Sequence, residues 1–411
     1  MLTLLKDGQF FRFWLGQVIS SLGDGINKVV IIYLVAQLSN DPLVIGLVIF
    51  LQMLPTAIFS IFIGSLADRY SKKWIMVISD LYRMIIVLMI IPFQHSLNSI
   101  FILIALHGIG SALFNPARVS SIPVLVGRDR IENAISISQA TRSAMNVIAP
   151  AIGGLLLTLN KLTLIFVIDA ITFLFSAFFI LTLTRLSKEF IQKSDESYID
   201  SIYNGIKRVI GIPPLRFLLL LLIPVSFVVG VINTNISTLS LYVFKVEGHH
   251  YGLLQASVGI GAIIGSLVLC PLLLRKIKLS SLLLIGTLAI GLWMILIFPV
   301  NIARETYGLI PIYIWYLGLG LINTLLFVPL SSLFLRITPA NFRGRGQAIL
   351  SFTVTIFTMS GLLGGGWLQN YTGILLGTAV AGILLVVVVA TFPFIRGYKE
   401  LRDADANYIE V

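Results

Sequence analysis

Charged residues are scarce in this chain. Only 11% of its 411 residues are Asp, Glu, Lys or Arg, whereas a soluble globular protein carries about 25%. Hydrophobic residues reach 57%, and a soluble protein of that composition would expose large apolar patches to water. The scarcity of charge therefore excludes an ordinary soluble domain and indicates a protein that lies in a lipid bilayer.

Cysteine and histidine are also rare. The single cysteine, Cys270, excludes a disulfide framework and a thiolate metal cluster, and the four histidines lack the spacing of a zinc site. The sequence contains no phosphate-binding glycine loop and no Ser/His/Asp or Cys/His constellation. We expect no bound metal, no cofactor, no direct use of ATP and no enzymatic activity.

Basic residues exceed acidic ones by 11, which on its own would suggest a nucleic-acid partner. The charges stand in short clusters between long apolar runs, as they do in the loops of a membrane protein, so we expect no nucleic acid to bind. The first apolar run is longer than a signal-peptide core and no cleavage site follows it. We expect it to be retained as the first membrane helix.

Long apolar runs predict twelve membrane-spanning helices. A bilayer core needs about 20 apolar residues per helix, and the uncharged stretch 346–395 is long enough for two spans folded at residues 370–373. The predicted spans are 12–38, 43–66, 74–93, 99–119, 141–160, 162–184, 217–244, 251–274, 279–300, 307–335, 346–368 and 373–395.

The distribution of Lys and Arg predicts the orientation of these spans. Three basic residues fall on one side (Lys161, Lys245 and Arg304), three fall within helices (Lys28, Arg83 and Arg142), and the remaining 23 of 29 fall on the other side. Basic residues gather in cytoplasmic loops, so both termini are expected in the cytoplasm, with the protein in the cytoplasmic (inner) membrane of a bacterium.

One long polar segment, 185–216, follows the sixth span. Apolar residues within 199–210 recur every three or four positions, which predicts an interfacial amphipathic helix. The expected domains are a six-helix bundle over 1–184, this linker, and a second six-helix bundle over 217–411. Two such bundles are typical of transporters that rock about a central site.

Polar side chains repeat along one face of several spans. Such faces point toward water or toward other helices, so a water-accessible cavity and plain helix-to-helix contact both stay open as interpretations. The faces consist of Gln17, Ser20, Ser21, Asp24 and Lys28 in the first span, His107, Ser111, Asn115 and Arg118 in the fourth, Ser226, Asn233, Ser237 and Ser240 in the seventh, Asn323 and Thr324 in the tenth, and Gln347, Ser351, Thr355 and Thr358 in the eleventh.

Charges within the first and sixth spans are the sharpest candidates for function. Each costs roughly 2.5–3.5 kcal/mol at a helix centre. Asp24 and Lys28 are four residues apart, so they can neutralise each other, either as a static pair or as a pair that takes up substrate or a proton. Asn27 lies beside them, and Asp169 is a second intramembrane acid that could carry a proton or bind a buried donor.

Residues 64–73, GSLADRYSKK, lie between the second and third spans. This segment resembles the signature loop of the major facilitator superfamily, a family of twelve-helix secondary transporters. The resemblance implies that Asp68 stabilises one conformation by pairing across the cytoplasmic side. The implied gating residues are Gly64, Asp68, Arg69, Lys72, Lys73, Asp80, Arg83 and Arg118; a plain basic loop that only sets topology is the alternative.

Residues 142–154, RSAMNVIAPAIGG, resemble the fifth-helix motif of proton-coupled exporters in this superfamily, with Ala149 where that motif has glycine. The motif residues are Arg142, Pro150, Gly153 and Gly154. The segments 13–25, 114–118 and 166–170 resemble the branch that contains macrolide-efflux proteins and enterobactin exporters.

The resemblance implies an all-α membrane protein with twelve transmembrane helices that works by alternating access. The expected function is proton-coupled export of a small amphipathic compound, such as a drug or a siderophore-like molecule, by a monomer in contact with membrane lipids. Two alternatives stay open: a flippase or facilitator for lysophospholipid-type lipids, and a membrane sensor or scaffold that transports nothing.

Overall fold

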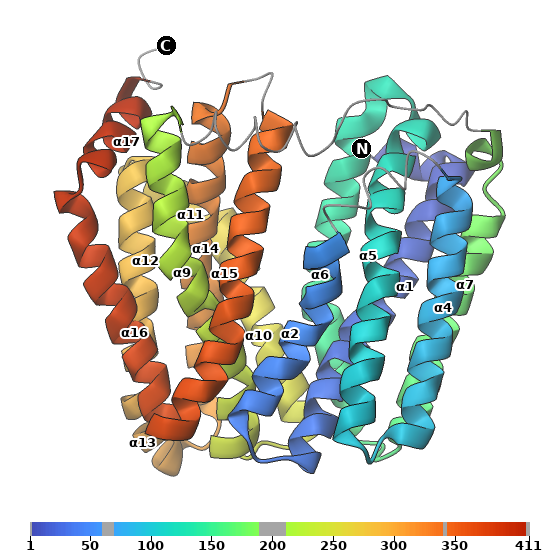
Figure 1. Ribbon diagram of the computed structural model, residues 1–411, viewed down its shortest axis with the longest axis horizontal. Coiled ribbons are helices and arrows are strands. Elements are labelled where there is room, and N and C mark those ends of the chain that lie inside the picture. The colour runs from blue at the N-terminus through green and yellow to red at the C-terminus, as the bar shows by residue number, and fades with distance from the viewer. Residues whose placement is uncertain (1, 60–69, 189–210, 340–342, 408–411) are drawn as a thin grey trace. The chain divides into compact units, whose positions relative to one another are not determined.

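The computed structural model describes residues 2–59, 70–188, 211–339 and 343–407. Of the described residues, 91% are helical and none lies in a strand, which confirms the all-α prediction (Figure 1). Eleven of the described helices are long and apolar enough to cross a membrane. A pair bent by 49° makes a twelfth span if it is taken as one.

The described helices follow one another along the chain. Their bounds are α1 (Gly8–Leu38), α2 (Pro42–Phe59), α4 (Lys72–Phe93), α5 (Leu97–Val126), α6 (Ile131–Leu157), α7 (Leu162–Leu181), α9 (Pro213–Thr238), α10 (Gly248–Ile264), α11 (Cys270–Leu274), α12 (Leu279–Ile295), α13 (Ile297–Tyr307), α14 (Ile310–Ile337), α15 (Arg343–Thr372), α16 (Ile374–Thr391) and α17 (Arg396–Asn407). Short π-helical turns extend α9 to Val243 and join α10 to α11.

Several predicted boundaries are wrong. α5 ends at Val126, whereas the predicted fourth span ended at 119. α6 begins at Ile131, whereas the predicted fifth span, 141–160, began ten residues later. Those limits were drawn near charged residues, but Arg118 and Arg142 lie within the helices and line a pocket. The ninth span bends between α12 and α13, so the predicted start of the tenth at 307 falls on α13.

Two glycines mark turns between helices. Gly308 has φ of 62° and ends α13. Gly373 has φ of 80° and separates α15 from α16, which confirms the turn predicted at 370–373. Positive φ is readily adopted only by glycine, so each of these residues is required at its turn.

The chain forms two compact units. The first consists of Met1–Asn40, Val48–Asp195 and Val246–Ala256, and the second of Asp41–Leu47, Glu196–Lys245 and Ser257–Val411. The start of α2 thus belongs to the second unit and the start of α10 to the first. The predicted amphipathic helix at 199–210 lies outside the described residues.

In the first unit, α1 packs against α6 and α7, while α4 packs against α5 and α7. Gly23 permits the close approach of α1 and α7, because a Cβ atom there would collide with the side chains of Asp169 and Thr172. This packing directs one face of α1 toward α4 and α5, where the polar side chains gather.

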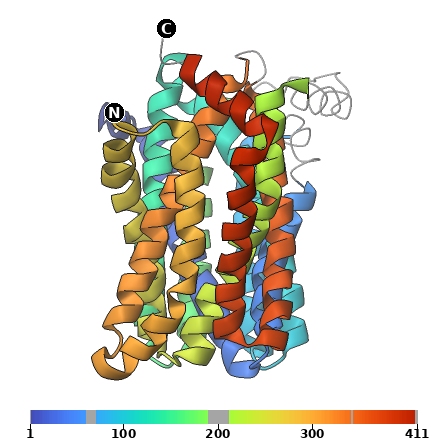
Figure 2. The same ribbon diagram turned by 90° about the vertical axis from the view of Figure 1, so that its left-hand side faces the viewer.

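In the second unit, α9 packs against α15 and α16, and α12 packs against α14 and α16; Figure 2 looks onto this unit. Buried polar groups join these helices. Thr234 donates a hydrogen bond to the carbonyl of Leu362 at 2.9 Å, and Ser240 bonds the Tyr316 hydroxyl at 2.6 Å. On α9, polar residues therefore hold helices together.

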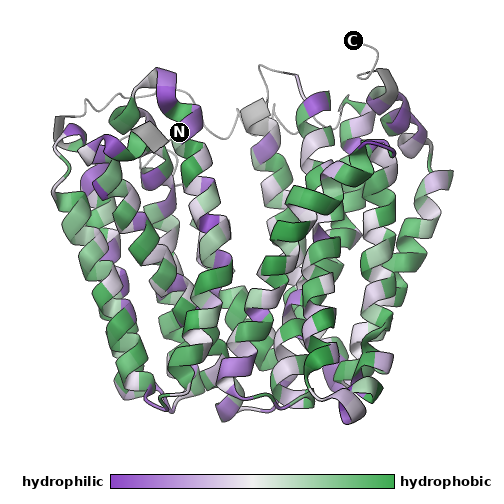
Figure 3. Ribbon diagram, turned by 180° about the vertical axis from the view of Figure 1, so that it is seen from behind, coloured by the Kyte–Doolittle hydropathy of each residue, from purple (hydrophilic) through white to green (hydrophobic). Residues whose placement is uncertain are grey.

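Hydropathy varies along the helices in the way that a bilayer requires. Apolar residues cover most of each helix, and hydrophilic residues gather toward helix ends and at a few internal positions (Figure 3). Large apolar side chains are exposed on the surface, such as Leu267, which is 73% exposed, and Ile302, which is 68% exposed. Such a surface is stable in lipid and not in water.

Candidate functional site

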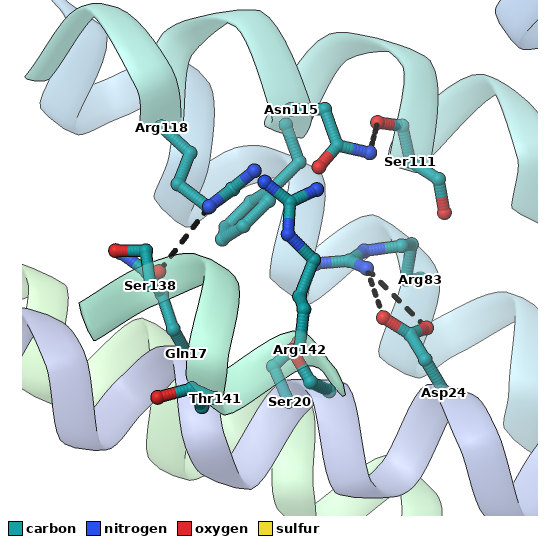
Figure 4. A pocket seen from close by; sticks show the side chains of 12 residues that line it. Gln17, Ser20, Asp24, Arg83, Ser111, Asn115, Arg118, Ser138, Thr141 and Arg142 are labelled. Carbon is teal, nitrogen blue, oxygen red and sulfur yellow. Dashed lines mark hydrogen bonds and ion pairs between the residues drawn. The ribbon is translucent and has the colours of Figure 1, made fainter. Parts of the chain in front are cut away.

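A polar pocket lies inside the first unit, among α1, α4, α5 and α6 (Figure 4). Its cavity volume is about 60 Å³. Its lining consists of Gln17, Ser20, Ser21, Asp24, Arg83, Ser111, Phe114, Asn115, Arg118, Ser138, Thr141 and Arg142. The polar faces predicted on the first and fourth spans meet here; what they do in transport stays a prediction.

Asp24 is the acid of this pocket, and Arg83 on α4 is its partner. A guanidinium nitrogen of Arg83 lies 3.2 Å from one carboxylate oxygen of Asp24 and 3.4 Å from the other. The Asp24 side chain is 38% exposed, whereas that of Arg83 is 2% exposed. The pocket therefore gives access to the acid while its basic partner stays covered.

Arg83 is held from several directions. It also donates a hydrogen bond to Asp80, one helical turn earlier on α4. Its guanidinium carbon lies 4.6 Å from the ring centre of Phe114 and 4.4 Å from that of Phe173. Stacking on aromatic rings and pairing with two carboxylates compensate for the burial of this charge.

The predicted pairing of Asp24 with Lys28 is wrong. Lys28 is exposed, lies outside the pocket lining, and has no hydrogen bond or ion pair with any described residue. The carboxylate of Asp24 instead points across to α4. Four-residue spacing brings two side chains near each other, but a fully buried Arg83 gains more from the acid than an exposed lysine does.

Two predicted residues near the pocket, Asn27 and Asp169, are buried and bonded to each other, and a third, His107, is half-buried beside Asp24. Asn27 donates a hydrogen bond to the carboxylate of Asp169, and Thr172 donates to the same side chain at 3.4 Å. Asp169 is 1% exposed. His107 lies with its Nε2 atom 3.8 Å from Asp24. Asn27, His107 and Asp169 are close to the pocket but do not line it.

The other half of the pocket is basic. A guanidinium nitrogen of Arg118 donates to the Oε1 atom of Gln17 at 3.3 Å. Arg142 reaches the pocket from α6, and no described residue forms a hydrogen bond or ion pair with it. Figure 4 shows the side chains of Arg83, Arg118 and Arg142 converging from three helices.

The remaining polar candidates belong to the second unit and do not form one face. Asn233 is exposed, Ser237 is buried at 1% exposure, and Asn323 is half-buried. Thr324 bonds its own helix at the carbonyl of Leu321. None of these residues lines the polar pocket of the first unit.

The loop motif is described only in part. Gly64, Asp68 and Arg69 lie outside the described residues. Lys72 and Lys73 begin α4, and Lys73 donates a hydrogen bond to the carbonyl of Leu183 at 3.1 Å. The gating role of this motif stays a prediction.

In the fifth-helix motif, α6 continues without a break through Pro150. A Cβ atom on Gly153 would crowd the backbone of Ile26 on α1, and one on Gly154 would crowd Gly252. Both glycines therefore permit close packing. The association of this motif with proton coupling stays a prediction, because the packing of the glycines does not test it.

Sequence reasoning did not single out Phe114, Ser138, Thr141 or Phe173 as parts of the site. The fifth span was predicted to begin at 141, so Ser138 lay outside it and Thr141 was its first residue. Their helical spacing with Arg142 was therefore not considered. A signal was present for Arg83: it is a charge within a predicted span, and such a charge needs a buried partner.

The model of the major facilitator superfamily matches residues 13–334. The chain belongs to this superfamily. Its members are transporters rather than enzymes, so this chain is a multi-pass membrane transporter of the bacterial type, with a small-molecule substrate.

Several relatives and solved structures are similar over most of this transporter. It is 27% identical to the uncharacterized MFS-type transporter YfiS of Bacillus subtilis, covering 90% of this chain and 89% of that protein. It is 27% identical to macrolide efflux protein A of Streptococcus pyogenes, covering 64% and 66%, and 25% identical to the enterobactin exporter EntS of Escherichia coli, covering 93% and 86%.

Solved structures support the fold. A bacterial homologue of the iron transporter ferroportin matches with a TM-score of 0.74 at 16% identity, covering 93% of this chain and 98% of that one. The peptide-transporter-family protein PepTSo matches with a TM-score of 0.76 at 12% identity, covering 96% and 98%. At this level of identity the similarity establishes the major facilitator fold alone.

Proposed function

We propose that this transporter exports a small amphipathic compound by alternating access and couples export to proton movement at Asp24. The observation that carries the proposal is the position of Asp24, an accessible acid on a membrane-spanning helix whose carboxylate pairs with the buried Arg83. Efflux relatives, a macrolide exporter and an enterobactin exporter among them, support the direction of transport.

The ion pair offers a physical basis for coupling. Asp24 lies on α1 and Arg83 on α4, so the negative charge of Asp24 attracts one helix to the other. A proton on Asp24 would remove that attraction and leave Arg83 with Asp80 alone. Since charge pairs are stronger in a medium of low dielectric than in water, loading and unloading one proton would change the balance between two arrangements of these helices.

We also infer that both termini face the cytoplasm and that one chain suffices for transport in contact with membrane lipids. The bias of 23 basic residues toward one side supports the orientation. Cysteine accessibility provides a test, because only Cys270 needs to be replaced before single cysteines are introduced at the termini. Labelling of both terminal cysteines in everted vesicles but not in intact cells is the expected result.

Transport in everted vesicles tests the proposed function. With a proton gradient imposed, addition of an exported compound should dissipate the gradient and load the vesicles with that compound. A macrolide, a catecholate siderophore and a labelled lysophospholipid cover the three cargo classes. Asp24→Asn should lower both signals to background, while Lys28→Gln serves as the matched control because that residue has no described partner.

Two outcomes would count against the proposal. Proton coupling at Asp24 fails if Asp24→Asn still exchanges protons for compound at the normal rate. Export of amphipathic compounds fails if only the lysophospholipid moves, which would identify a lipid facilitator of the same fold.

A further inference from the structure

The distribution of charge in the pocket is uneven. Asp24 and Asp80 both pair with Arg83, so the acids gather on one side. On the other side Arg118 bonds only the neutral amide of Gln17, and Arg142 has no bonded partner among the described residues. This half of the pocket has two guanidinium groups and no carboxylate in its lining.

Buried hydrogen-bond donors on the same side are also unused. The Nε2 atom of Gln17 and the Oγ atom of Ser138 are covered and have no hydrogen-bond partner among the residues that the structure describes, and the two residues are 7% and 5% exposed. Buried polar groups are nearly always bonded in proteins, since an unsatisfied one is costly. Both residues line the pocket, so a rotation of either side chain would bring its unused donor to a bound molecule.

We propose that Arg118, Arg142, Gln17 and Ser138 form a subsite for the carboxylate of an amphipathic organic anion. The inference rests on the proposed function only in taking this pocket as the place where cargo binds. All four residues line this pocket and have hydrogen-bond donors, which match the acceptor oxygens of a carboxylate, and guanidinium groups bind carboxylates with two parallel hydrogen bonds.

The rest of the pocket agrees with an organic anion rather than a small inorganic one. The ring of Phe114 forms part of the wall, and an aromatic side chain is a better neighbour for the apolar part of an organic anion than for a hydrated inorganic ion. A cation would meet two uncompensated guanidinium charges, so this side of the pocket disfavours positively charged cargo. Among amphipathic compounds, the structure therefore selects acids over amines.

Equilibrium binding to the purified full-length protein tests this assignment without any gradient. Dansylglycine, its uncharged amide, and the cationic dansylcadaverine have the same fluorescent ring and differ in charge. The acid should bind at least about tenfold more tightly than the amide, since hydrogen bonds between charged groups contribute more than neutral ones. Equal binding of acid and amide, preference for the cation, or absence of binding would each overturn the proposal.

Variants locate the subsite. Arg118→Gln and Arg142→Gln should each weaken binding of the acid by about tenfold or more and leave the amide unchanged, while Arg118→Lys should retain part of the preference. Arg130→Gln is the matched control, because this residue donates to the carbonyl of Val126 outside the pocket. Ser138→Ala removes a donor without removing a charge and should weaken the acid only slightly.

Two further measurements separate this proposal from others. Displacement of dansylglycine by chloride alone at low concentration would indicate an inorganic anion site and overturn the organic class. Asp24→Asn should bind the acid as tightly as the unchanged protein or more tightly, because a like charge is removed. Intact binding with unchanged transport by that variant would sink the coupling role of Asp24 and leave the anion subsite standing.

Discussion

The carboxylate of Asp24 on α1 lies 3.2 Å from the guanidinium of Arg83 on α4. This pair joins two helices that are separated by α2 in the chain. It also places the accessible member at the pocket and the covered member within the helix packing, so the two residues are expected to respond differently to substitution.

Removal of Arg83 should destabilise the protein. Arg83→Gln leaves the buried carboxylate of Asp80 without its cation, and breaking a buried pair costs about 3–5 kcal/mol. The melting temperature of the purified variant should therefore be clearly lower than that of the parent. It can be measured as the temperature at which the monodisperse peak in size-exclusion chromatography is lost. The melting temperature of Arg83→Lys should lie between those of Arg83→Gln and the parent protein, because an ammonium group cannot stack on two rings and bond two acids at once.

Removal of Lys28 should have little effect on stability. The residue is exposed and bonds no described residue, and a charge within a span costs roughly 2.5–3.5 kcal/mol on insertion scales. We expect Lys28→Gln to express at the same level or higher and to melt at the same temperature. A drop like that of Arg83→Gln would revive the static Asp24–Lys28 pair.

Gly23→Ala should separate α1 from α7. Its Cβ atom would collide with Asp169 and Thr172, and overpacking of this kind costs about 1–3 kcal/mol. Gly8→Ala is the control, since nothing lies within 4 Å of a Cβ atom there. The melting temperature of Gly23→Ala should fall below that of the parent protein, and that of Gly8→Ala should not. Equal melting temperatures for the two variants would contradict the close approach of α1 and α7 at Gly23.

Substitution of Asp405 should loosen the attachment of α17 to α12. Asp405 on α17 accepts hydrogen bonds from the backbone N–H and the hydroxyl of Ser280, both at 2.9 Å. Lys278 at the start of α12 makes no capping bond of its own, so Asp405 takes that role. Loss of an N-cap costs about 0.5–2 kcal/mol.

Asp405→Ala should therefore make the segment 396–407 more sensitive to protease. Ser280→Ala retains the backbone donor and should give a smaller effect. Equal protease resistance in all three proteins would contradict the capping role.

A pair near the start of the chain should respond to acid. Arg185 donates a hydrogen bond to Asp7 at 2.7 Å. Partial burial raises the pKa of Asp7, but the hydrogen bond and charge of Arg185 and the backbone N–H groups of Gln9 and Phe10 outweigh it, so the pKa lies below its usual value.

The lowered pKa of Asp7 stabilises the folded state at pH values above the pKa of an unfolded aspartate, about 3.9, and this stabilisation is lost as the pH falls through the folded pKa. The melting temperature should therefore depend less on pH in the acidic range for Asp7→Asn than for the parent. An identical pH profile for both would show that the pair contributes nothing.

The sequence by itself determined the number and type of spans. Twenty-residue apolar runs have few alternatives to membrane helices, because each buried backbone group must be bonded within the helix. The turn at Gly373 was likewise local, since the need for positive φ depends on neighbouring residues. The polar faces of the first and fourth spans also followed from helical period alone, with residues such as Gln17 and Asn115 on them.

Tertiary structure decided the partners. Asp24 bonds Arg83, which is 59 positions away, rather than Lys28 one turn away, and Asp405 caps a helix through Ser280, which lies 125 positions before it. The ends of α5 and α6 also depended on packing, because burial allowed Arg118 and Arg142 to lie within helices. Charge pairing depends on distance in space and on burial, and neither is encoded in the spacing of residues along one helix.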